Sequence, residues 1–130
     1  MKASAGFTLV EILVAVVILV LITGMVLVTY QGSIRNGQNQ AARAHGQQVA
    51  QVANTWFAAR PDINAHNYNG TDCKTNKTYA PWGVVEGHNA GYPTHGNAPT
   101  GTQYCSLTAT SSRSIVVNVQ INDLLFVEGQ

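Results

Sequence analysis

One acidic residue lies inside the most apolar stretch of the chain. The stretch runs from Phe7 to Val28, and its few non-apolar residues are Thr8, Glu11, Thr23 and Gly24. A carboxylate at the centre of a membrane-spanning helix costs about 2.5–3.5 kcal/mol, and less near an interface, so it is by default a functional residue that needs a counter-charge. Glu11 is therefore the leading candidate functional residue.

The two cysteines, Cys73 and Cys105, could form a disulfide or contribute to a metal site. Both lie beyond the apolar stretch, on the side that such an anchor would export, and a cysteine pair outside the cytoplasm favours a disulfide. A metal site would need further ligands at short spacing, and no C-x-x-C or H-x-x-x-H pattern occurs. We therefore predict a Cys73–Cys105 disulfide, no metal and no cofactor.

The remaining residues that could do chemistry form no recognisable catalytic set. His45 falls on the apolar stripe of a predicted helix, so we expect a core or interface histidine whose hydrogen bonds are satisfied. His88 and His95 lie in a segment rich in Gly and Pro, and we expect solvated loop residues there. Because no G-x-S-x-G motif and no paired carboxylates occur, the prediction is a protein without catalytic residues, not an enzyme.

Charge is sparse, which bears on possible partners. Only 10% of the 130 residues are charged, with 7 Lys and Arg against 6 Asp and Glu. This balance does not support electrostatic capture of nucleic acid or of anionic lipid, so nucleic acid stays a possible partner without support from charge.

The N-terminus resembles that of the type IV prepilins. A short leader, Met1 to Gly6, carries one positive charge and is followed by Phe7-Thr8-Leu9-Val10-Glu11 and an uninterrupted apolar run. In a secretory signal peptide the small residues would follow the apolar region, whereas here they precede it. The resemblance covers about the first 28 residues.

The resemblance implies how the chain is processed and assembled. Prepilin peptidase would cut between Gly6 and Phe7, and the new amine of Phe7 would be N-methylated. The subunit would wait in the inner membrane until an assembly platform with its ATPase added it to a homopolymeric surface filament. In that helical filament Glu11 of one subunit would neutralise the Phe7 amine of its neighbour, since an unpaired buried charge is very costly.

The resemblance leaves the type of filament open. A type IV pilus subunit would serve twitching motility, adhesion, biofilm formation or DNA uptake. The alternatives are a pseudopilin of a type II secretion system and a minor pilin at a filament tip. The cysteine pair and the scattered acids of the C-terminal part disfavour a pseudopilin, because the major pseudopilins tend to have an acidic calcium-binding loop instead of a disulfide.

Beyond Val28 the chain turns polar but keeps a helical period. Apolar side chains recur every three or four residues and predict one face of an amphipathic helix: Tyr30, Ile34, Ala41, His45, Val49, Val52, Ala53, Trp56 and Phe57. Pro61 disfavours helix at the residue before it. The sequence therefore predicts one helix from Phe7 to about Ala59.

The C-terminal half has the pattern of an antiparallel sheet. We expect loops at 62–78 and 87–101, a short strand at 82–86, and strands at 103–110, 114–121 and 124–127 separated by turns at Ser111-Ser112 and Asn122-Asp123. The last three strands would form a meander whose apolar face covers the helix. The predicted class is α+β, with a long N-terminal helix and an antiparallel sheet of 3–4 strands, which is also the pilin fold.

The expected organisation follows from these patterns. Residues 1–6 would be the leader, 7–28 the transmembrane and polymerisation helix, 29–60 its amphipathic half, and 61–130 the globular head.

Overall fold

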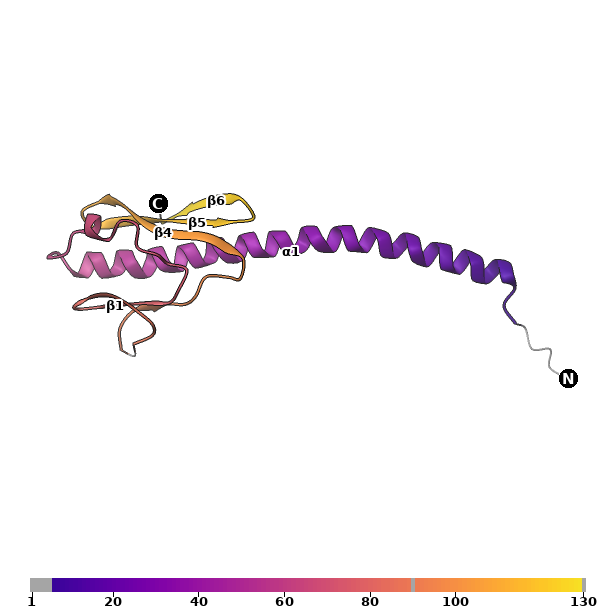
Figure 1. Cartoon of the computed structure of the whole chain (residues 1–130), viewed down its shortest axis with the longest axis horizontal. Coiled ribbons are helices and arrows are strands. Elements are labelled where there is room, and N and C mark those ends of the chain that lie inside the picture. The colour runs from indigo at the N-terminus through magenta and orange to yellow at the C-terminus, as the bar shows by residue number, and fades with distance from the viewer. Residues whose placement is uncertain (1–5, 90, 130) are drawn as a thin grey trace. The chain divides into compact units, whose positions relative to one another are not determined.

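The computed structural model describes residues 6–89 and 91–129. It contains the α-helix α1 (Leu9–Ala59) followed by short strands in two antiparallel sheets, an α+β arrangement consistent with the pilin fold (Figure 1). Contacts divide the chain into two compact units, Met1–Asn36 and Gly37–Gln130, which are described separately. Residues 1–5, and with them most of the predicted leader, lie outside the described residues.

The first unit is the N-terminal part of α1. Its large apolar side chains from Leu9 to Val28 are exposed, and the helix is long and apolar enough to cross a membrane, with a mean hydropathy of 3.1 over its most apolar window. The helix begins at Leu9, two residues after the predicted start, because Thr8 caps it instead of joining it.

In the second unit one face of α1 is buried, as predicted. The buried helical residues are Ala42, His45, Gly46, Val49, Ala50, Ala53, Trp56 and Phe57. The prediction for Ala41 was wrong, because this residue is exposed and Ala42 is buried in its place. Gly46 and Ala50 also belong to the buried face. The middle of the buried face is therefore rotated around the helix axis, away from Ala41 and toward Ala42.

The C-terminal sheet is the predicted meander. It has the order β4-β5-β6, with β4 (Thr102–Ser111), β5 (Ser114–Ile121) and β6 (Leu124–Glu128) all antiparallel. The β5–β6 turn is Asn122-Asp123, and both residues have positive φ angles, 51° and 62°. Asn and Asp tolerate this left-handed conformation, which a two-residue hairpin turn of type I′ requires.

A second sheet was not predicted, because the sequence indicated one sheet of 3–4 strands. It has the order β2-β1-β3, from β1 (Lys77–Ala80), β2 (Gly83–Glu86) and β3 (Thr94–His95). A strand was expected at 82–86, and β2 occupies most of that range. By contrast, β1 begins at the end of the loop predicted at 62–78, and β3 lies in the middle of the loop predicted at 87–101; the first of these loops also holds the short 3-10 helix η1 (Ala65–Tyr68). Each missed strand is only two or four residues long and is flanked by Asn, Thr, Gly or Pro, which hides any alternation.

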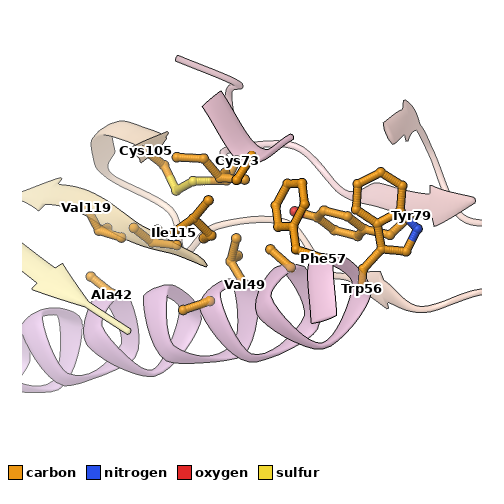
Figure 2. Close-up of a cluster of buried hydrophobic side chains, with 14 of the residues drawn as sticks. Ala42, Val49, Trp56, Phe57, Cys73, Tyr79, Cys105, Ile115 and Val119 are labelled. Carbon is orange, nitrogen blue, oxygen red and sulfur yellow. A yellow bond between two sulfur atoms is a disulfide. The ribbon is translucent and has the colours of Figure 1, made fainter. Parts of the chain in front are cut away.

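The two sheets enclose the second half of α1. Figure 1 shows β4, β5 and β6 on one side of this half and β1 on the other. The core joins the helix to both sheets: Val49 and Phe57 lie among Ile115 and Val119 of β5, and Trp56 contacts Tyr79 of β1 edge to face, with ring centroids 5.7 Å apart (Figure 2). The second unit, Gly37–Gln130, is called the head from here on. Burial of these large side chains, about 1.5–3 kcal/mol each, is the main contribution to the stability of the head.

Candidate functional site

The candidate site begins with two reciprocal hydrogen bonds at the start of α1. The backbone N–H of Thr8 donates to Glu11 Oε2 over 2.8 Å, and the N–H of Glu11 donates to Thr8 Oγ1 over 3.2 Å. This is a capping box, in which two side chains satisfy backbone donors that no helical turn can reach. This role of Thr8 was not predicted, although the T-x-x-E spacing before an apolar run is a signature of it.

The bond predicted to be cut lies immediately before this cap. Gly6, Phe7 and Thr8 are outside the helix, and all three are exposed. Phe7 also lines a shallow apolar groove together with Glu11, Ile12 and Leu19. A peptidase would therefore meet an accessible, non-helical backbone at the Gly6–Phe7 bond, with Glu11 about one helical turn beyond it.

Only one oxygen of the Glu11 carboxylate accepts a hydrogen bond from the described residues. Its Oε2 accepts the Thr8 N–H, while its Oε1 makes no hydrogen bond to any described residue. The positive end of the helix dipole favours an anion in this first turn. What the site can do chemically is to hold a cation at the free carboxylate oxygen without giving up the helix cap.

The disulfide predicted between Cys73 and Cys105 is present, and both cysteines are buried. Cys105 is in β4, and Cys73 lies in the segment before β1, so the bridge ties this segment to the meander (Figure 2). The N–H of Cys73 also donates to the carbonyl of Cys105 over 3.2 Å. The bridge constrains the head but lies in the other unit from Glu11.

The structure confirms the predicted environments of His45 and His88 but not that of His95. His45 is buried and its Nε2–H donates to the Cys73 carbonyl over 2.8 Å, as expected for a satisfied core histidine. His88 is exposed, as expected. For His95 the prediction of a solvated loop residue was wrong, because it is fully buried in β3 opposite Lys77.

His95 belongs to a buried polar cluster. Its ring lies 5.7 Å from that of His45 and 5.8 Å from that of Tyr79. Its Nδ1–H donates to the Gly96 carbonyl over 3.0 Å, whereas its Nε2 and the Tyr79 hydroxyl have no partner. Burial, reinforced by His45 and Lys77, lowers the pKa of His95, and burial alone raises the pKa of Tyr79.

No metal site is evident in the described part of the chain. Across residues 6–89 and 91–129, no three His, Cys, Asp or Glu side chains come together where they could hold an ion. The candidate site is therefore the helix start at Thr8 and Glu11. The disulfide and the buried residues of the head stabilise the head itself.

Comparison with known proteins bears on the same helix start. Residues 1–27 match the family model described as the prokaryotic N-terminal methylation motif. No curated protein and no solved structure matches the chain significantly. The similarity thus covers the segment that holds Gly6, Phe7 and Glu11 and leaves the head without a match.

Proposed function

Because residues 1–27 match the prokaryotic N-terminal methylation motif, we propose that the chain is a type IV pilin-like prepilin protein and a structural, non-catalytic subunit of a type IV pilus. Prepilin peptidase removes the leader after Gly6, Phe7 becomes the N-methylated first residue, and the subunit remains in the inner membrane until it is added to a surface filament. The filament is a homopolymer that the inner-membrane assembly platform and its ATPase extend.

The observation that carries this proposal is the half-satisfied carboxylate of Glu11. Cleavage before Phe7 creates an amine directly next to the capping box, and in a sheath of apolar helices a lone ammonium would be very costly. Glu11 Oε1 has no partner among the described residues, so it can accept the Phe7 amine of a neighbouring subunit. A stagger that brings these two charges together also sets the register of the polymer.

The exposed apolar surface supports polymerisation. In the most apolar stretch of α1, 18 residues long, no residue is buried within the chain. Lipid covers this surface before assembly, and helices of neighbouring subunits cover it afterwards. The disulfide of the head fits an extracellular filament, because oxidising conditions keep such a bridge intact.

The decisive experiment separates the cap from the charge. Glu11→Gln keeps the capping box, because Gln serves at this position as Glu does, but removes the negative charge. Glu11→Val removes both. We expect mass spectrometry to find both variants cut before Phe7, and both to give far less sheared surface filament than the wild type.

Two outcomes would refute the proposal. Wild-type filament yield from Glu11→Gln would show that the charge is not needed. A mature wild-type chain that retains Met1 would show that no processing occurs. Filaments confined to the periplasm would instead favour the pseudopilin alternative.

A further inference from the structure

One buried side chain attaches the segment around β3 to the rest of the head. This segment, residues 88–100, is here called the β3 segment, and the structure describes it except for residue 90. Among its described residues only His95 is buried, with 1% of its surface exposed. Tyr92 contacts Trp82 edge to face, but both rings are exposed. The one core contact of the described β3 segment is therefore made by a side chain that can take up a proton.

The other attachments of the β3 segment are backbone hydrogen bonds at the edge of a sheet. β3 is two residues long and lies at the edge of the order β2-β1-β3. The N–H of Tyr79 donates to the carbonyl of Pro93, and the N–H of Ala98 donates to the carbonyl of Lys74, each over 2.8 Å. Water can replace such bonds when a segment moves away, so each contributes little net free energy. Burial of the His95 ring is thus the main attachment.

His95 is buried as a neutral ring. Its Nδ1–H donates to the Gly96 carbonyl over 3.0 Å, so Nε2 is the nitrogen that would take up a further proton. Nε2 has no hydrogen-bond partner, and neither has the nearby hydroxyl of Tyr79. A proton on Nε2 would therefore put a charge and a donor into the core without an acceptor, which is costly.

The charges around His95 add to this cost. The ring of His45 in α1 lies 5.7 Å away, and Lys77 of β1 lies opposite His95 in the register. Lys77 is itself paired with Glu86 over 2.8 Å. Burial, followed by the nearby His45 and Lys77, lowers the pKa of His95, whereas Asp72 before β1 acts in the opposite direction and has a smaller effect than either. The closed arrangement therefore favours the neutral ring.

The remainder of the head is held by contacts that do not involve the β3 segment. β1 keeps β2 on its other side, and the Cys73–Cys105 bridge ties the segment before β1 to β4. The meander of β4, β5 and β6 is a separate sheet. Opening at the β3 edge can thus stay local, as it does in the least stable parts of many proteins.

From these contacts we infer that His95 is an acid-sensitive switch. When Nε2 takes up a proton, the ring leaves the core and the β3 segment detaches from β1, while the meander stays folded. The edge of β1 that β3 covers then becomes accessible to solvent. The switch operates within a single chain, so it does not depend on the proposed function.

Hydrogen–deuterium exchange of the full-length protein in a non-ionic detergent tests the switch. Protection of the amides is compared at about pH 7.5 and about pH 5.0, after correction for the intrinsic effect of pH on exchange. These values lie on either side of about 6.5, the ordinary pKa of histidine, and above those of Asp and Glu, about 3.9 and 4.3.

We expect the Tyr79 and Ala98 amides to lose protection at the lower pH. One proton changes the opening equilibrium by at most about tenfold per pH unit below pH 6.5, so the loss should be several-fold and at most about 30-fold. The amides of β5, the central strand of the meander, should keep their protection.

Two variants assign the effect to His95. His95→Leu keeps an apolar side chain in the core but cannot titrate, so the protection of the Tyr79 and Ala98 amides should no longer depend on pH. His88→Gln is the matched control, because His88 belongs to the same segment but is exposed. It should behave like the wild type.

Three results would overturn the switch. The first is unchanged protection of the Tyr79 and Ala98 amides in the wild type at the lower pH. The second is an equal loss in His95→Leu, which would assign the effect to another group. The third is a loss that extends equally to β5, because the whole head would then unfold. If His95→Leu fails to fold, the wild type still decides, since the comparison of Tyr79 with β5 needs no variant.

Discussion

The contact between α1 and the meander is closest at Gly46, which makes this residue the sharpest test of the packing. A Cβ atom placed on Gly46 would lie 3.0 Å from Val119 Cγ2 and 3.1 Å from Glu128 Cγ. Val119 is fully buried in the central strand, and Glu128 is held by Arg43 over 3.0 Å and by Gln47 over 3.2 Å. Neither neighbour is free to move away. Gly46 is therefore required by the close approach of helix and sheet.

Gly37→Ala provides the matched control. Both glycines are in α1, but a Cβ atom on Gly37 would meet nothing within 4 Å. In a helix interior Ala is more stable than Gly by about 1 kcal/mol, a gain that both variants share. Overpacking at Gly46 costs about 1–3 kcal/mol. We therefore expect Gly37→Ala to be the more stable variant by about 1–3 kcal/mol.

Urea unfolding of the full-length protein in a non-ionic detergent measures this difference. Trp56 is buried and reports the loss of the head's structure. If Gly46→Ala gained as much stability as Gly37→Ala, the helix and the meander would be further apart than the structure shows, and the account of the core would be wrong.

Two further predictions concern the head. Replacing both Cys73 and Cys105 by Ser should lower the free energy of unfolding by about 2–5 kcal/mol, and a loss below about 1 kcal/mol in the same urea assay would contradict a stabilising bridge. Because burial lowers the pKa of His95 below its usual 6.5, the unfolded chain binds a proton more readily than the folded one. The stabilisation that comes from keeping His95 neutral should be fully present above about pH 6.5. Below that pH the free energy of unfolding should fall, by at most about 1.4 kcal/mol per pH unit. His95→Gln should flatten this dependence, whereas the exposed control His88→Gln should behave like the wild type. Equal pH profiles for the two variants would contradict the role of His95, which His45, Lys77, Tyr79 and Asp72 surround.

Elements with a strong period were predictable from the sequence. The alternation in β5 gave its bounds, Ser114 to Ile121, and Asn122-Asp123 marked the turn after it. The end of α1 at Ala59 followed from Pro61. In each case a local property, periodicity or a restricted backbone, determines the structure without help from distant residues.

Elements that depend on distant contacts were not predictable. β1 is stabilised by a paired strand on each side and by the packing of Tyr79 on Trp56. β3 is only two residues long, and both of them pair with β1. Nothing local distinguishes these segments from loops. His95 was misplaced for the same reason, because its burial comes from β1 and α1 and not from its own Gly- and Pro-rich surroundings. Glu11 was predictable because one acid stands out in an apolar run, but its hydrogen bond to the N–H of Thr8 was not predicted.

The capping box also bears on why Glu11 would be needed after the proposed cleavage. The start of a helix carries a partial positive charge, so an ammonium placed there is disfavoured by the dipole as well as by burial. Removing the leader before Phe7 puts such an ammonium next to the cap of α1. The anion proposed to neutralise it is Glu11 of a neighbouring subunit, whose second carboxylate oxygen has no partner among the described residues. A neutral Gln at this position would preserve the helix start but leave the amine to face the dipole alone. We therefore expect the proposed assembly to depend on the charge of Glu11 more than on its shape.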